Sequence, residues 1–276
     1  MPRRGWGRRL HHVWQQMGED NISIMAAGIA YYAMLSIFPG MSALVLTYGL
    51  VADPQIIEHH VSSLGGVLPG EALKLLSDQL NALVTAPREG LGLGLIASVF
   101  IGLWSSTSGT SAMMNALTVA YEGKEERGIL HFYALSIALT VGGVIFLLLS
   151  LVLIAGVPAA AMRLPLPEFW RQLLPLLRFP MLALLALVAI GTLYRLAPDR
   201  RRPGWDFFRP GTIAASLLWL AASSAFSFYA THFGSYDRTY GSLGAVAIML
   251  VWLYVSAYIV LAGAELNGEG LRDDKA

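Results

Sequence analysis

"GSLGAVAIMLVWLYVSAYIVLAGAELN", residues 241–267, contains no charged side chain before Glu265. About 20 apolar residues in an α-helix cross a hydrocarbon core about 30 Å thick, because each residue rises 1.5 Å. The stretch therefore predicts a membrane-spanning helix over 242–264. It also raises a question about Glu265, where the uncharged run stops. This carboxylate either ends the helix in water or points into the protein.

Similar apolar blocks recur along the whole chain. Of its 276 residues, 55% are hydrophobic and only 13% are charged, whereas about a quarter of a soluble domain is charged. We therefore expect an all-α, polytopic membrane protein, with a single domain over residues 1–276 and a bundle of six transmembrane helices. The predicted spans are 24–51, 91–120, 132–157, 179–196, 211–233 and 242–264.

The distribution of Lys and Arg predicts the orientation, since these residues are enriched in cytoplasmic loops. With the basic arm 1–23 inside, thirteen of the nineteen Lys and Arg residues lie in predicted cytoplasmic segments. Both termini are therefore expected in the cytoplasm. The loop 52–90 would lie outside. Its leucines recur at helical spacing between polar residues, which predicts an amphipathic helix that either lies on the bilayer or covers the helix ends.

The second span carries small residues at every fourth position, and such a ridge lets two membrane helices approach closely. We interpret it chiefly as a packing seam. Asn115 on the same span needs a partner for its amide, because hydrocarbon offers none. The ridge consists of Ser98, Gly102, Ser106 and Thr110.

Two further features bear on a polar path through the membrane. Ser223 and Ser227 belong to a stripe of hydroxyl groups on the fifth span, which either bond to their own helix or line such a path. Pro39 in the first span removes one backbone hydrogen bond and predicts a helix kink, with or without a binding role.

On the sixth span, Tyr254, Tyr258 and Glu265 fall on one face at 100° per residue. That shared face favours a carboxylate that points into the bundle, although its position near the helix end also allows a solvated one. Together with Asn115 and the serines of the fifth span, these residues make up a candidate polar route between spans 2, 5 and 6.

Arginines cluster between the fourth and fifth spans, with aromatic residues beside them. They can meet anionic lipid headgroups at about 1 kcal/mol each, or they only fix the topology. The cluster is too short, and too close to the bilayer on both sides, to favour RNA. Membrane lipids are thus the expected partners, nucleic acid is not expected, and a homo-oligomer is left open. The cluster is Arg195, Arg200, Arg201, Arg202 and Arg209.

The sequence predicts neither a metal site nor a cofactor. It has no cysteine, its histidines lack the spacing of metal ligands, and it has no phosphate-binding Gly-Lys loop. No nucleophile with a neighbouring base is visible, so we do not expect an enzyme.

Four blocks carry a resemblance to a known family: "DNISIMAAGIAYYAMLSIFPG", "GLWSSTSGTSAMMNALTVAYEGKEERG", the segment 205–246 and "WLYVSAYIVLAGAELN". In this order they resemble the YihY family of bacterial inner-membrane proteins, which is also named for the virulence factor BrkB. The resemblance implies six helices in the bacterial plasma (inner) membrane but no settled activity. Some members carry the label ribonuclease BN. The sequence argues against that activity, since no segment outside the membrane is long enough to form a metal-dependent nuclease domain.

Two functions remain open at this stage. One is a transporter or lipid-translocating protein that uses the polar route. The other is a non-transporting envelope protein, in which the polar residues only hold helices together.

Overall fold

The structure of the protein is a computed structural model, which describes residues 6–51, 100, 104, 107–156, 167–199, 207–233 and 242–273. Within these ranges all regular structure is helical, which confirms the all-α prediction. Residues 107–120 are helical as well. The named elements are α1 (Trp6–Glu19), α2 (Ile22–Val51), α6 (Ile129–Leu151), the π-helical segment η2 (Val152–Gly156), α8 (Glu168–Leu196), α9 (Pro210–Phe233) and α11 (Ser242–Asp273).

Four segments of the described chain are long and apolar enough to cross a membrane: Ile129–Ile154, Phe179–Leu196, Pro210–Tyr229 and Val246–Leu271. They coincide with the third to sixth predicted spans. The first predicted span lies in α2, where the described apolar stretch Ile22–Ser36 is shorter. Part of the second span and all of the loop 52–90 lie outside the described residues, so the count of six and the loop helix stay predictions.

Two helices are longer than the sequence analysis predicted. α8 begins at Glu168 and continues through Pro180, since neighbouring groups in a membrane helix can satisfy the backbone that a proline frees. α11 continues past Glu265 to Asp273, because its final turns pack against other helices. α2 is helical on both sides of Pro39, and the kink there stays a prediction.

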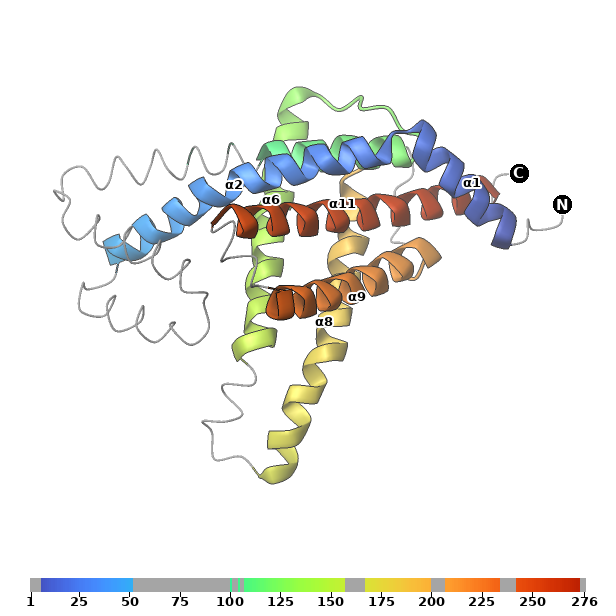
Figure 1. The fold of residues 1–276 in the computed structure, drawn as a ribbon. Coiled ribbons are helices and arrows are strands. Elements are labelled where there is room, and N and C mark those ends of the chain that lie inside the picture. Colours follow the sequence, from blue (N-terminus) through green and yellow to red (C-terminus); the bar gives the residue numbers. More distant parts are fainter. Residues whose placement is uncertain are drawn as a thin grey trace.

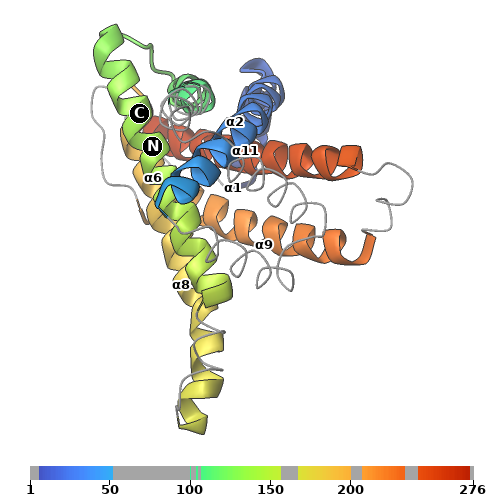
Figure 2. The ribbon, with the colours of Figure 1, turned by 90° about the vertical axis from the view of Figure 1, so that its left-hand side faces the viewer.

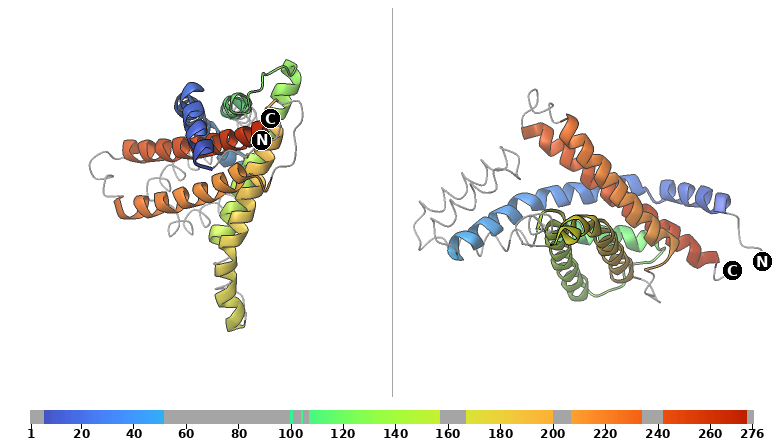
Figure 3. Two further views of the ribbon diagram at one scale, coloured as in Figure 1. Left: turned by 90° about the vertical axis from the view of Figure 1, so that its right-hand side faces the viewer. Right: turned by 90° about the horizontal axis from the view of Figure 1, so that it is seen from below.

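The described helices form two sets that cross each other. α11 lies beside α2 and α9, while α6 and α8 run across these three helices (Figure 1). Figure 2 and Figure 3 show the same crossing from other sides. α1 and the last turns of α11 lie together, and we call this end of α11 the terminal end of the molecule (Figure 1).

α1 and α2 meet at a sharp corner next to Asn21. This residue has a φ of 53°, a left-handed conformation that asparagine adopts more readily than most residues. Its side-chain Nδ2 donates a hydrogen bond to the carbonyl of Glu19 at 3.2 Å. The corner directs α1 toward the last turns of α11, with which it makes contact.

The main buried core lies toward the terminal end. Ile22 of α2, Leu117 of the 107–120 helix, Tyr194 of α8 and Leu261 of α11 are fully buried. By contrast, α6 leaves most of its apolar side chains exposed, among them Leu147 at 58%. An apolar helix that is exposed in this way is typical of a helix surrounded by lipid.

Candidate functional site

Three polar side chains are buried in the part of α11 that lies beyond the predicted span. Glu265 is 1% exposed, Asn267 0% and Glu269 2%. The solvated helix end that the sequence allowed for Glu265 is therefore wrong, because α11 continues for two more turns and other elements cover it. A buried polar group needs partners inside the protein, and these partners define the site.

Asn267 joins three parts of the chain. Its Oδ1 accepts a hydrogen bond from the backbone N–H of Gly211 at 2.9 Å. This N–H belongs to the first turn of α9, where backbone donors have no partner within their own helix. The Nδ2 of Asn267 donates to Thr212 Oγ1 at 2.9 Å and to Tyr121 Oη at 3.4 Å.

Glycine lets the helices come close enough for these contacts. A Cβ on Gly263 would lie 2.5 Å from Tyr194 Oη and 2.7 Å from the carbonyl oxygen of Gly211. The Tyr194 hydroxyl itself donates a hydrogen bond of 2.5 Å to the carbonyl of Val260. α8, α9 and α11 are thus held together by backbone approach as well as by side chains, as small residues in membrane helices permit.

The two carboxylates lie on the opposite side of α11 from Asn267. Glu265 and Glu269 are four residues apart, so they occupy successive turns of one face. Tyr258 and Tyr254 continue this face, and their rings lie 6.0 Å apart. The hydroxyls of Tyr254 and Ser23 are hydrogen-bonded at 2.8 Å, so this face points toward α2.

α1 covers the carboxylate end of that face. His12 Nδ1 lies 3.4 Å from Glu269 Oε2, with the histidine side chain 45% exposed. One turn further along, Gln16 Nε2 donates to Glu122 Oε1 at 3.3 Å. α1 therefore contacts both the end of α11 and the turn that follows the 107–120 helix.

Arg127 ties that turn to the end of α8. Its guanidinium donates to both carboxylate oxygens of Glu125, at 2.7 and 2.5 Å, and to the carbonyl of Ala197 at 2.8 Å. The hydrogen bond to Glu125 raises the pKa of Arg127, the nearby negative charges of Glu125 and Asp199 add to the rise, and partial burial opposes it. Asp199 also accepts the backbone N–H of Glu126 at 2.8 Å.

The predicted residues of the fifth and sixth spans do not line a single route. Ser223 accepts a hydrogen bond from Trp252 Nε1 at 3.4 Å, and Ser256 accepts one from Trp219 Nε1 at 3.1 Å. Positions 252 and 256 lie about 200° around the helix from Tyr254. Ser223 of α9 thus contacts one face of α11 through Trp252, whereas Tyr254 lies on the other face of α11, which points toward α2.

Asn115 and Ser227 lie apart from the site. Both residues are exposed. Next to Asn115, Met114 and Leu117 are fully buried, so apolar side chains take the inward face of the 107–120 helix. The place of Asn115 on the candidate polar route stays a prediction.

The described part of the small-residue ridge packs against α6. Thr110 and Thr140 are hydrogen-bonded through their hydroxyls at 2.7 Å, and Ser111 and Ser136 at 3.1 Å. At Thr110 the neighbour of the ridge is therefore the third span. The other three ridge residues, Ser98, Gly102 and Ser106, lie outside the described residues.

Two arginines of the predicted cluster can be placed. Arg195 is half-buried in the last turn of α8. Arg209 is half-buried before α9, and its Nη1 lies 4.0 Å from where a Cβ on Gly270 would be. Arg200, Arg201 and Arg202 lie outside the described residues.

Sequence reasoning missed Asn267 and Glu269, because the predicted span ended at 264. A signal was present: after Glu265 the chain runs "LNGEGL" without proline, and Glu265 and Glu269 keep the four-residue spacing of one helix face. Among the described residues, no group of three or more His, Asp and Glu side chains could hold a metal ion.

Comparison with known proteins agrees with the block pattern of the sequence. The profile of the virulence factor BrkB family matches residues 13–275. The chain belongs to the virulence factor BrkB family. It is therefore a membrane protein of this family, as the apolar helices also indicate.

Relatives in several bacteria are similar over nearly their whole length. The chain is 28% identical to the UPF0761 membrane protein YihY of Salmonella typhimurium (strain LT2) over 275 residues, which cover 96% of this chain and 88% of that protein. It is 28% identical to a protein of Bacillus subtilis (strain 168) named as ribonuclease-like, YfkH, over 248 residues, or 88% of this chain and 87% of that one. No solved structure matches the chain.

Proposed function

We propose that this BrkB-family protein is a transporter or lipid-translocating protein whose working groups lie at the terminal end. The route between the second, fifth and sixth predicted spans would run along α11, where Asn267 contacts Tyr121, Gly211 and Thr212 on one face. The carboxylates of the proposal lie on the opposite face of α11, toward α1 and α2, and so flank this route rather than line it.

The burial of Glu265 and Glu269 is the observation that carries the proposal. Each is at most 2% exposed, and removing a charge from water costs several kcal/mol. Two ionised carboxylates four residues apart on a helix also repel each other. Such a pair is stable only with counter-charges or bound protons, and the imidazole of His12 lies 3.4 Å from Glu269.

Proton uptake and release at Glu265 is the mechanism that we infer. A carboxyl group at this position is reached by water only when α1 or α2 moves away from α11. Opening would then let the proton exchange, and closing would bury the group again. This exchange is the kind of event that couples an ion gradient to transport.

We also infer that the terminal end faces the cytoplasm of a bacterial inner membrane. The excess of Lys and Arg in the segments on that side supports this orientation. Arg195 and Arg209 would then lie at the level of the headgroups, where each favours anionic lipids by about 1 kcal/mol.

A second candidate is an envelope protein that transports nothing. The hydrogen bonds of Asn267 favour this candidate. Its side-chain oxygen and amino group bond to three neighbouring residues, which is the arrangement of a structural residue that holds helices together. In this case the carboxylates only hold α1 against α11.

The substitution Glu265→Gln separates the two candidates, because the amide keeps the size of the side chain and removes its charge. We expect a folded, membrane-inserted variant that fails to restore the lipid and metabolite profile of cells lacking the protein. Glu19→Gln, at an exposed position of α1, is the matched control and should restore the profile. Full restoration by Glu265→Gln would rule out proton work there, and loss of folded protein would favour the fastening role.

A further inference from the structure

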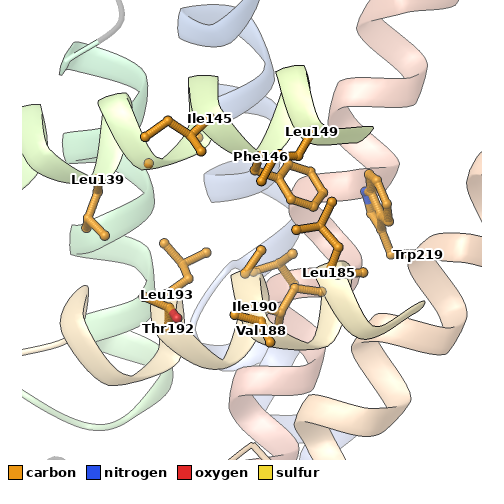
Figure 4. A pocket seen from close by; sticks show the side chains of 15 residues that line it. Leu139, Ile145, Phe146, Leu149, Leu185, Val188, Ile190, Thr192, Leu193 and Trp219 are labelled. Carbon is orange, nitrogen blue, oxygen red and sulfur yellow. The ribbon is translucent and has the colours of Figure 1, made fainter. Parts of the chain in front are cut away.

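An apolar pocket of about 440 Å³ lies between α6 and α8. Phe146 and Leu149 of α6 face Leu185 and Ile190 of α8 across it, and Trp219 of α9 closes one side (Figure 4). Its volume lies within the ~300–1,000 Å³ of ligand pockets.

The lining offers almost nothing to a polar ligand. Thr192 is the only lining residue with a hydroxyl group, and the indole N–H of Trp219 is already bonded to Ser256 at 3.1 Å. The Trp219 ring instead packs against Phe146, with centroids 5.7 Å apart. A buried water needs two to four polar partners, so this space suits neither water nor a polar solute.

We propose that the pocket binds the acyl chain of a membrane phospholipid. The pocket opens among helices that are long and apolar enough to span a membrane, so hydrocarbon chains are the surrounding solvent at this depth.

The position of the pocket along α11 suits a lipid with its polar part at the terminal end. Val260 lines the pocket, and its carbonyl accepts the Tyr194 hydroxyl. Glu265 follows five residues later, about 7–8 Å along the helix. Chain binding does not depend on translocation, because a lipid can occupy this pocket in a protein that moves none.

Two glycines of α6 make the proposal testable by filling the pocket. Gly142 and Gly143 line it, and a Cβ added to either would meet nothing within 4 Å. Leucine also favours helix more than glycine does, so Gly143→Leu should fold. Gly28→Leu is the matched control, because a Cβ on Gly28 of α2 also meets open space and this residue does not line the pocket.

The experiment uses the full chain in lipid nanodiscs with phosphatidylethanolamine that carries a diazirine on one acyl chain. After illumination, mass spectrometry locates the label. We expect it on the facing stretches 139–149 and 185–193, and we expect Gly143→Leu to lower that labelling on the order of tenfold while Gly28→Leu leaves it unchanged. Ala189→Leu fills the pocket from the α8 wall and should lower the labelling to a similar extent. It replaces Gly143→Leu if that variant does not fold.

Three results would overturn the proposal. Labelling that both pocket-filling variants leave intact would mean ordinary lipid around the helices. Label confined to the outer face of α6 would mean that the pocket is not entered. Stronger labelling of the pocket by a diazirine fatty acid than by the phospholipid would assign it to a free acid. None of these readouts measures transport. A negative labelling result therefore leaves the proposed function untested, and a failure of the proposed function leaves the labelling result unaffected.

Discussion

A single amide, that of Asn267, connects the ends of three helical segments. It satisfies a backbone donor at the start of α9 and bonds to a hydroxyl on each of two neighbouring segments. Its burial is complete, so water cannot replace a lost partner. The residue therefore matters less for its own bonds than for the polar groups that its loss would leave buried and unpaired.

We predict that Asn267→Ala lowers the free energy of unfolding by about 1–3 kcal/mol, because the buried N–H of Gly211 loses its hydrogen bond to Asn267 Oδ1. Chemical or thermal unfolding of the purified protein in detergent measures the loss. Asn115→Ala provides the control, since that asparagine is exposed and its truncation should change stability little. Equal losses in the two variants would contradict the placement of Asn267.

At the residue scale the sequence predicted helix faces better than contacts. The shared face of Tyr254, Tyr258 and Glu265 follows from 100° per residue alone, and the burial of Glu265 agrees with it. Which neighbour a face meets depends on packing between distant segments. Periodicity does not contain that information, and so the sequence could not name the hydrogen-bond partners of Asn267.

The first helix, α1, differs from the long apolar helices because it has one buried face and one exposed face. α1 is short, carries few apolar residues, and buries Val13 and Met17 while exposing Trp14 at 70%. The sequence analysis treated it only as a basic arm. Its helical form follows from contact with α11 and α2, because an isolated helix of this length is marginal in water.

We predict that cysteines placed on the two faces of α1 react at different rates. Met17→Cys should react slowly with a maleimide in detergent, because position 17 is 9% exposed, whereas Gln15→Cys should react several-fold faster at its exposed position. The natural chain has no cysteine, so neither variant has a background. Similar rates, in variants of unchanged stability, would show that α1 is not held against α11.

At the scale of the whole molecule, the crossing of the two helix sets is what the sequence could not supply. Composition and run length predict how many apolar helices there are and where they lie in the chain. The angle at which they pack depends on which ridges fit which grooves. Two hydroxyl–hydroxyl hydrogen bonds join the 107–120 helix to α6, through Thr110 and Ser111. Residue spacing alone does not identify α6 as the neighbour.

We predict that both termini lie on one side of the membrane and that the loop 52–90 lies on the other. The contact between α1 and the last turns of α11 (Figure 1) and the Lys and Arg distribution motivate this expectation. Activity reporters fused after Arg272 and within residues 73–84 should give opposite readings, with the cytoplasmic signal at the C-terminal fusion. Two identical readings would contradict the odd number of membrane crossings that the predicted topology places between the two fusion points.

The packing of α1 on the end of α11 also sets an order for biosynthesis. α1 leaves the ribosome before α11, and the turns of α11 that it contacts are made some 250 residues later. At about 5–20 residues per second, α1 waits on the order of ten seconds or longer for its partner. During that interval a protease can reach it, so resistance to cleavage near Met17 would mark the moment at which α11 has packed against α1.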